Sequence, residues 1–373
     1  MTYQKETTLA QIGNQQSEAV GAINTPIYLS SAFRHPDVGM NNGYDYIRTG
    51  NPTRDVLEVA IARLENGDRG FACSSGMSAI QLVFSLFESG DHIIASRDIY
   101  GGSYRLFEWL EKKYKISFSY WHEETDGDID PFIKKNTRAI FIETPTNPLM
   151  RETDLAKIAK IAELHRLLLI VDNTFYTPYI QRPIELGAHV VIHSGTKYLG
   201  GHNDLLAGLV VARDKEISDQ LFAYHNGAGA VLAPFDCWLL IRGMKTLALR
   251  MRQHEENAIK IKDYLSASPF VSEVLYPGRG GMLSFKIIKE EWVSPFLKAI
   301  QLFTFAESLG GVESLITYPT TQTHADIPEE IRNKYGLCNR LLRVSVGIEH
   351  VDDLINDLEH AFQQCQVEQL VIK

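Results

Sequence analysis

Short apolar runs alternate with longer amphipathic stretches over most of this chain. Apolar runs of strand length occur at 70–73, 92–95, 116–120, 139–142, 167–171, 190–193 and 209–212. Between several of these runs apolar residues recur at helical spacing, as in the stretch 154–165. Strands that alternate with helices in this way predict an α/β fold whose large, mostly parallel sheet carries helices on both faces.

The pattern changes after a long predicted helix that ends near residue 265. The rest of the chain holds a mixed series of predicted strands, at 282–287, 312–316 and 341–346, and predicted helices, at 296–309 and 351–362. Because the regular alternation is lost, this region is expected to form a smaller α+β domain.

The first fifty residues show no strong periodicity and are typical of an extended arm with turns. Such an arm must be ordered by something, either its own domain or a neighbouring subunit. The expected organisation is therefore an arm at 1–50, a large α/β domain at 51–247 and an α+β domain at 248–373.

The composition narrows the possible functions. The chain has 373 residues, of which 45% are hydrophobic, and this is enough for two domains with real cores. A net charge of −9 without a basic run disfavours nucleic-acid binding, and no apolar segment approaches the length of a membrane span. Four scattered cysteines without a C-x-x-C pair disfavour a zinc site and a disulfide framework, and they suit a cytoplasmic location.

One lysine stands between a predicted strand and a Gly-Gly turn, in the stretch 193–204 that reads HSGTKYLGGHND. Lys197 is flanked there by the hydroxyls of Ser194 and Thr196. A desolvated lysine loses its proton readily and can form a Schiff base with an aldehyde cofactor, while the hydroxyls could hold a phosphate. The alternative is an ordinary surface lysine in a loop between a strand and a helix.

Asn147, Asp172 and Lys197 all come directly after predicted strands, at the carboxyl ends where open α/β sheets bind their ligands. Asp172 could keep a pyridine nitrogen protonated, or it could be a structural carboxylate. Asn147 could approach the ring hydroxyl of such a cofactor, or it could simply form a turn. Tyr100 could stack on the ring or pack within its loop.

Two further features could bind anions. Small residues at 74–79 lead from a predicted strand into a helix, where free backbone N–H groups can face a phosphate. Arg343 lies in an otherwise apolar strand, and it could either capture a carboxylate or be a surface charge on an edge strand. A nucleotide-binding dehydrogenase is disfavoured, because no G-x-G-x-x-G comes after the first strand.

Several ordered motifs together resemble the Cys/Met-metabolism family of pyridoxal-phosphate enzymes. They are YIRTGNPT at 46–53, SGMSA at 75–79, YGGSY at 100–104, ETPTNP at 143–148, DNT at 172–174, SGTKYLGGH at 194–202 and RVSVGIE at 343–349. The resemblance spans nearly the whole chain and implies the aspartate-aminotransferase fold, fold type I, with pyridoxal 5'-phosphate as cofactor.

The resemblance also implies roles for individual residues. Lys197 carries the Schiff base, Asp172 pairs with the ring nitrogen and Tyr100 stacks on the ring. The phosphate is held by Gly76, Met77, Ser194 and Thr196 of the same chain and is reached by Tyr46 and Arg48 of the neighbouring subunit. The family is then expected to form an obligate dimer, usually doubled to a homotetramer as a dimer of dimers.

The substrate residues implied by the resemblance are Arg343 with Ser314, for the α-carboxylate, together with Glu313 and Tyr104. The YGGSYRLF sequence at 100–107 and the glutamate at 313 favour chemistry at Cγ. The expected reaction replaces the acyl group of an O-acyl-L-homoserine by L-cysteine, and also by sulfide. Lys197, assisted by Tyr100, is expected to move the protons. Elimination from cystathionine and a regulatory protein that only binds the cofactor remain as alternatives.

Overall fold

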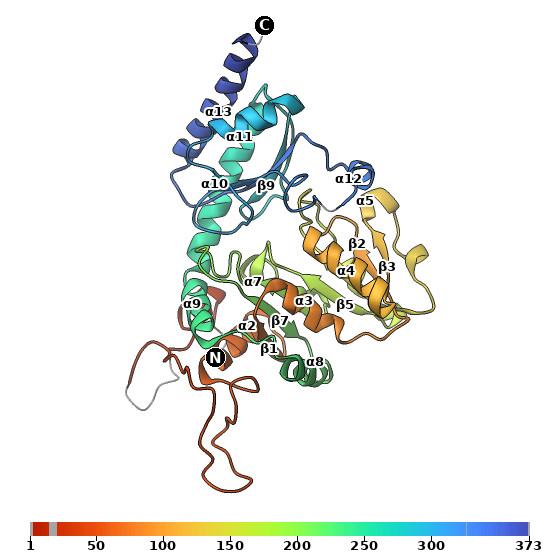
Figure 1. Ribbon diagram of the computed structural model, residues 1–373, viewed down its shortest axis with the longest axis vertical. Helices are drawn as coiled ribbons and strands as arrows, with labels where there is room; N and C mark the ends of the chain where they lie inside the picture. The colour runs from red at the N-terminus through yellow and green to blue at the C-terminus, as the bar shows by residue number, and fades with distance from the viewer. Residues whose placement is uncertain (1–2, 15–20, 326, 372–373) are drawn as a thin grey trace.

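A seven-stranded sheet forms the centre of the larger part of the molecule (Figure 1). The computed structural model describes residues 3–14, 21–325 and 327–371. In spatial order the strands are β1 (Arg69–Cys73), β7 (Gly208–Ala212), β6 (Val190–Ser194), β5 (Leu168–Asp172), β4 (Thr137–Glu143), β2 (His92–Ser96) and β3 (Ser117–Trp121). Only β7 runs antiparallel to its neighbours, so the expected mostly parallel sheet is confirmed.

Helices cover both faces of this sheet, because its strands are apolar on both sides. Along β5, Ile170 packs into one core cluster, while Leu169 and Val171 pack into the other. The helices on the Ile170 side are α3 (Gly76–Phe84), α4 (Gly101–Tyr114) and α8 (Lys215–Ala228). Those on the opposite side are α2 (Pro52–Glu65), α6 (Leu155–His165) and α9 (Pro234–Met244).

A smaller five-stranded sheet comes next in the chain. Its spatial order is β10 (Thr304–Phe305), β11 (Leu315–Thr317), β12 (Leu341–Ser345), β9 (Met282–Ile287) and β8 (Val271–Leu275). It shares a core with α10 (Leu247–Ala267), α11 (Val293–Ala299) and α13 (Val351–Val371), in which Phe285, Phe296 and Phe362 are fully buried. Helix α10 contributes to both cores, and it therefore ties the two sheets together.

The remaining elements are short. They are α1 (Lys5–Ala10), α5 (Glu123–Asp126), α7 (Thr177–Ile180), α12 (Glu329–Tyr335) and the 3-10 turns Asp130–Phe132, Pro183–Leu186 and Glu290–Trp292. Within the described ranges, none of the helices combines the length and apolar character that crossing a membrane requires.

The predicted helix at 296–309 is wrong, because α11 ends at Ala299. The carboxylate of Asp357 on α13 accepts the backbone N–H groups of Gln301, Leu302 and Phe303 at 2.8–2.9 Å. With these donors bound to a side chain, the backbone leaves the helix and continues in extended form. The segment 304–309 is then free to run past the end of the larger sheet.

Two other boundaries also differ from the predictions. The strand expected at 312–316 begins only at Leu315, because the N–H of Ser314 donates to the Glu349 carboxylate at 2.6 Å instead of to a neighbouring strand. The arm expected at 1–50 contains the helix α1, whose Leu9 is buried in the core of the larger part. Its described residues 21–50 hold only turns and isolated bridges.

Candidate active site

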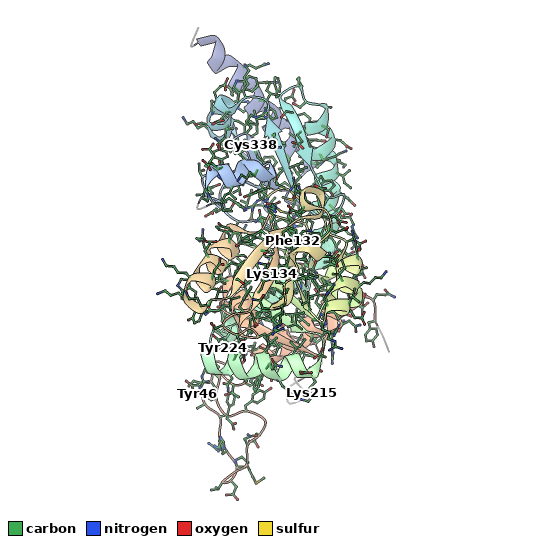
Figure 2. All side chains as sticks on the ribbon, turned by 90° about the vertical axis from the view of Figure 1, so that its right-hand side faces the viewer. Tyr46, Phe132, Lys134, Lys215, Tyr224 and Cys338 are labelled. Atoms are coloured by element: carbon green, nitrogen blue, oxygen red, sulfur yellow. The ribbon has the colours of Figure 1, made fainter. Side chains whose placement is uncertain are left out.

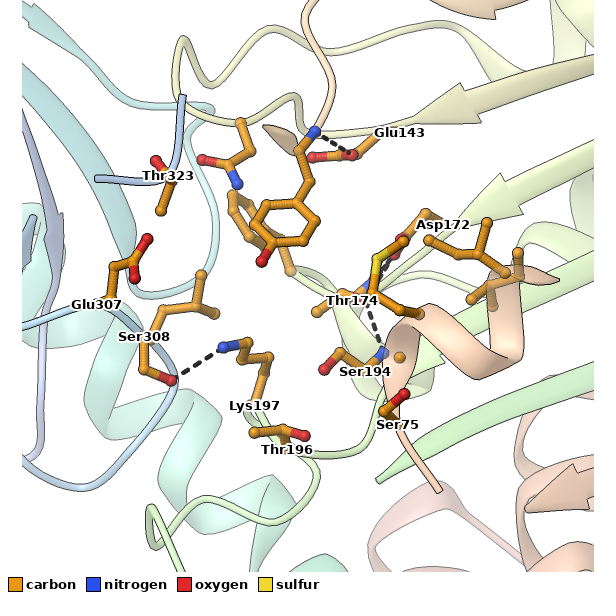
Figure 3. Close-up of a pocket in the computed structure, with 18 of the residues that line it drawn as sticks. Ser75, Glu143, Asp172, Thr174, Ser194, Thr196, Lys197, Glu307, Ser308 and Thr323 are labelled. Carbon is orange, nitrogen blue, oxygen red and sulfur yellow. Dashed lines mark hydrogen bonds between the residues drawn. The ribbon is translucent and has the colours of Figure 1, made fainter. Parts of the chain in front are cut away.

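A cavity of about 240 Å³ opens where three parallel strands of the large sheet end (Figure 3). Glu143, Asp172 and Ser194 are the last residues of β4, β5 and β6, and all three line it. On the opposite side Figure 3 places Glu307, Ser308 and Thr323, which come from the smaller part of the chain. The cavity therefore lies between the two sheets. The further lining residues include Ser75, Gly76, Met77, Tyr100, Asn147, Thr174, Thr196, Lys197 and Arg343.

Lys197 lies in the turn after β6, and its Nζ donates to Ser308 Oγ at 2.9 Å. Burial, reinforced by the positive charge of Arg343, lowers the pKa of Lys197 to about 8. Arg250 of α10 supports the turn from behind, because its guanidinium donates to the carbonyl oxygens of Tyr198 at 2.7 Å and Leu199 at 3.4 Å. The structure thus presents a buried amine that gives up its proton near pH 8, well below the usual range for a lysine.

The burial of Lys197 predicts how the stability of the cofactor-free protein depends on pH. Between about pH 8 and 10.5 the unfolded chain holds a proton on Lys197 that the folded chain has lost, so stability rises with pH. Below pH 8 the cost of burying the ammonium is present in full. The Lys197→Met variant is therefore expected to be more stable than the wild type at pH 7, by about 3 kcal/mol. Urea unfolding measures this difference, which should shrink steadily towards pH 10.5; a difference independent of pH would contradict the lowered pKa.

Asp172 faces the cavity because side chains alternate along β5, and this places it on the same side as Ile170. Its Oδ1 accepts the N–H and the hydroxyl of Thr174, at 3.0 and 2.6 Å. Burial raises the pKa of the Asp172 carboxyl, and a cation in the cavity would stabilise its ionised form. A protonated pyridine nitrogen is such a cation, so Asp172 fits the role expected from the sequence.

The N-terminus of α3 forms a polar cradle at one end of the cavity. The hydroxyl of Ser75 caps the helix by accepting the Ser78 N–H at 3.0 Å, while the first-turn N–H groups at Gly76 and Met77 have no acceptor within the helix. A side chain at Gly76 would crowd Ser194, its Cβ lying 3.1 Å from the Ser194 Cβ. This combination of small residues, hydroxyls and a helix N-terminus suits a phosphate group.

Tyr100 and Asn147 reach the cavity from two loops of the large sheet. The backbone N–H of Tyr100, which precedes α4, donates to Glu143 Oε2 at 3.0 Å (Figure 3). The side-chain oxygen of Asn147 accepts Arg343 Nη1 at 2.9 Å. Burial raises the pKa of Glu143 well above its usual range, and the nearby Asp172 carboxylate adds to the effect.

Arg343 is buried and lies in β12, which has a neighbouring strand on each side. The interpretation as a surface charge on an edge strand is therefore wrong. Its Nη2 donates to the Ser308 carbonyl and the Thr317 hydroxyl, both at 3.1 Å, and its Nε has no partner among the described residues. The partners named here are neutral, so the guanidinium can still bind a carboxylate that enters the cavity.

Three of the expected substrate residues do not line the cavity. Ser314 is fully buried, and its hydroxyl donates to Glu349 Oε2 at 2.9 Å. Glu313 accepts Asn203 Nδ2 at 2.9 Å, and the ring of Tyr104 packs on Tyr120 at 5.6 Å. In each case these contacts hold the side chain away from the cavity, so the position of these three residues in the chain does not support their assignment as substrate residues.

Glu307 and Ser308 take the place expected for Glu313 and Ser314. The sequence interpretation missed them because it placed both in the last turn of the helix predicted at 296–309. The glycine pair at 310–311, which comes shortly after these two residues, could have indicated that the chain passes close to another segment. In the structure, a side chain at Gly310 would collide with the backbone of Lys197 and Tyr198. A chain that approaches the lysine turn so closely must bring its preceding residues to the same site. Ser75, Glu143, Thr174 and Thr323 also line the cavity without having been assigned a role.

Tyr46 and Arg48 lie outside the cavity. Arg48 Nη1 donates to the backbone carbonyl and to the side-chain oxygen of Asn226 on α8, the latter at 2.9 Å. Tyr46 is half exposed, and Figure 2 places it near Tyr224 of α8, in the lower half of the view, far from Cys338 in the upper half. This position agrees with the prediction that they act outside their own chain.

Comparisons with known proteins identify the family of this chain. The model of the Cys/Met metabolism PLP-dependent enzymes matches residues 6–363. A cystathionine gamma-synthase/O-acetylhomoserine (thiol)-lyase of Bacillus subtilis is 60% identical over 99% of this chain and 98% of its own length. A cystathionine gamma-synthase of Haemophilus influenzae is 57% identical over 96% of this chain and 98% of its own length.

Solved structures agree as well. The cystathionine gamma synthase of Xanthomonas oryzae pv. oryzae, in complex with cystathionine, has a TM-score of 0.95 at 39% identity and covers 98% of this chain and 100% of its own. The cystathionine gamma-lyase of Lactobacillus plantarum, complexed with L-serine, has a TM-score of 0.94 at 44% identity with the same coverage. The expected fold type is thereby confirmed, and the chain belongs to the Cys/Met metabolism enzymes that depend on pyridoxal phosphate.

Proposed function

We propose that this protein is a cystathionine γ-synthase. It replaces the acyl group of an O-acyl-L-homoserine, with acetyl as the expected acyl group, by L-cysteine and so forms cystathionine. Sulfide in place of L-cysteine gives homocysteine. The names of the two bacterial relatives described above support this reaction, and one of them also carries the name of an O-acetylhomoserine (thiol)-lyase.

The observation that carries this proposal is the charge pattern of the cavity. The Arg343 guanidinium, which donates to the Ser308 carbonyl, suits the α-carboxylate of an amino acid. Figure 3 places the Glu307 carboxylate next to Ser308. A reaction that joins two amino acids brings two carboxylates and two ammonium groups into one site. A cavity that combines a guanidinium whose Nε has no partner among the described residues, the Glu307 carboxylate and a reactive amine suits such a pair of substrates.

Each residue has a task in this proposal. Pyridoxal phosphate, when bound, supplies an electron sink for the charge left on a substrate carbon that has lost its proton. Asp172 keeps a proton on the ring nitrogen, and Arg343 orients the substrate by its carboxylate. Lys197 Nζ, whose pKa of about 8 lies close to neutral pH, accepts and returns protons at the substrate carbons. The hydroxyl of Ser308 holds this amine in place at 2.9 Å.

The decisive experiment is product analysis with purified protein. O-acetyl-, O-succinyl- and O-phospho-L-homoserine are each combined with L-cysteine and with sulfide, and cystathionine is offered alone in a parallel reaction. The expected result is cystathionine from the acetyl donor and L-cysteine, with homocysteine when sulfide replaces L-cysteine. Cleavage of cystathionine without any replacement product would instead indicate the γ-lyase, and binding of pyridoxal phosphate without turnover would indicate a regulatory protein.

The N-terminal arm supports a complex of several subunits. Several of its apolar side chains are strongly exposed in the single chain, with Ile23 77%, Leu29 71% and Val38 97% accessible. The arm projects from the body of the molecule next to α8 (Figure 1). Covering such a surface favours association, and we propose that the arm packs on a second copy and brings Tyr46 and Arg48 to the phosphate there. Two such dimers form the proposed homotetramer.

Co-expression of two inactive variants tests this arrangement. The Lys197→Ala chain lacks the amine, and the Arg48→Ala chain lacks the arm's arginine. If the arm serves the neighbouring subunit, each mixed dimer has one complete site, so about a quarter of all sites recover in an equal mixture. Steady-state rates of the mixture, compared with each variant alone, measure this. Rates that merely average those of the two variants would place Arg48 in its own chain's site.

A further inference from the structure

One buried histidine of the smaller part contacts both loops that carry Tyr100 and Asn147. His324 lies in the segment between β11 and α12 and is only 1% exposed. Its Nε2 lies 2.9 Å from the carbonyl oxygen of Asn147 and 3.2 Å from that of Ile99, the residue before Tyr100. Its Nδ1 lies 2.7 Å from the hydroxyl of Thr323, which lines the cavity.

These partners fix the protonation of the ring. Carbonyl oxygens only accept, so Nε2 must carry the hydrogen that is shared between Asn147 and Ile99. Burial, reinforced by the charge of Arg343, lowers the pKa of His324 to about 4, and the ring is therefore neutral near neutral pH. Nδ1 then accepts the hydrogen of the Thr323 hydroxyl, which fixes the rotamer of that side chain.

A second contact joins the same segments independently of the ring. Gly101, the first residue of α4, lies so close to the segment of His324 that a Cβ there would collide with the Thr323 carbonyl oxygen. The side-chain oxygen of Asn147 is held in turn by Arg343 of β12. The loops of Tyr100 and Asn147, both from the large sheet, are thus fastened to the smaller part at several points.

We infer that His324 is a positioning residue, whose ring sets the distance between the loops of Tyr100 and Asn147 and holds Thr323 towards the cavity. His324 does not itself line the cavity, so it acts through these three residues. The inference rests on the proposed function only in that Tyr100 and Asn147 face the bound cofactor. Removing the ring leaves two buried carbonyl oxygens without their donor, and both loops then depend on their remaining contacts with the smaller part for their alignment.

The test compares two substitutions of His324 in the cofactor-loaded protein. His324→Leu removes the donor, and kcat is expected to fall about 10²-fold with a smaller change in KM, because both loops lose their alignment. His324→Gln places an amide N–H near the position of Nε2 and should recover most of the loss. The visible circular dichroism of bound pyridoxal phosphate reports the surroundings of the ring, and it should weaken in His324→Leu and return in His324→Gln.

The matched control is His92→Leu. His92 is also fully buried and has both ring nitrogens bonded, to Thr137 at 2.8 Å and Ser119 at 2.9 Å, but it lies at the start of β2, away from the cavity. It should lose stability without a change in the dichroism. If His324→Leu changes kcat and dichroism no more than His92→Leu does, or if His324→Gln recovers nothing, the inference is wrong.

Gly101→Ala provides the same test from the other side of the contact. It forces the α4 terminus away from Thr323 and should produce the same loss of dichroism and kcat, even if His324→Leu does not fold. A Gly101→Ala protein with wild-type dichroism and kcat would overturn the inference. Failure of the proposed function would look different, because the wild type itself would then bind no pyridoxal phosphate or form no replacement product.

Discussion

Replacing Lys197 by alanine is expected to lower the rate of γ-replacement by about 10⁴-fold or more, because the variant loses the group that moves protons at the substrate. Among the described residues that line the cavity, Lys197 carries the only amino group, so nothing nearby can substitute for it. Its pKa of about 8 is what makes the amine available near neutral pH. Initial rates with O-acetyl-L-homoserine and L-cysteine measure the loss.

Two further variants show whether the reaction needs the amine of Lys197 or only its positive charge, and whether the loss is specific to this lysine. Lys197→Arg keeps a positive charge, but the guanidinium holds its proton at every accessible pH, and it should be almost as inactive as Lys197→Ala. Lys215→Ala removes a lysine whose Nζ pairs with Asp219 at 2.9 Å on the exposed side of α8, and it should retain the wild-type rate. Appreciable turnover by either Lys197 variant would remove this residue from the proton-transfer steps.

Replacing Arg343 by lysine is expected to lower kcat/KM by about 10²- to 10³-fold, mainly through a higher KM for the amino-acid substrates. Lysine keeps the charge but cannot reproduce the flat fork that contacts the Asn147 oxygen at 2.9 Å and the Ser308 carbonyl at 3.1 Å. The substrate carboxylate then loses a paired donor, and Ser308 loses a support next to Lys197.

Arg340→Lys is the matched control for Arg343→Lys. Arg340 is three residues away and donates to the Ile288 carbonyl at 3.4 Å, outside the cavity, so this change should alter kcat/KM less than about twofold. Separate titrations of the two amino-acid substrates show which of them depends on Arg343. An unchanged KM for both substrates would mean that the carboxylate binds elsewhere.

The sequence predicts those parts of the site that depend on regular strands. Asp172 and Lys197 come after continuous apolar runs, and parallel strands that alternate with helices bring their carboxyl ends to one edge. The neighbouring strands β5 and β6 do bring both residues into the cavity. The position of this side of the site therefore depends on local periodicity, which a single sequence displays.

The other side of the site depends on contacts between distant residues. Helical spacing in 296–309 is real, yet the Asp357 carboxylate draws the backbone out of the helix from more than fifty positions away. Arg343 could not be told from a surface charge, because its burial depends on the strands that pair on both sides of β12. Periodicity carries no information on such partners, and for this reason Glu307 and Ser308 were not anticipated.

The Asp357 contact makes the terminal helix α13 a remote determinant of the catalytic chemistry. The segment that it diverts carries Ser308, whose hydroxyl meets the Lys197 amine at 2.9 Å, and Glu307 beside it. Natural variation or laboratory evolution in α13 can therefore retune substrate preference through the path of this segment. Such changes would leave every cavity side chain chemically the same and would act only through the position of Glu307 and Ser308.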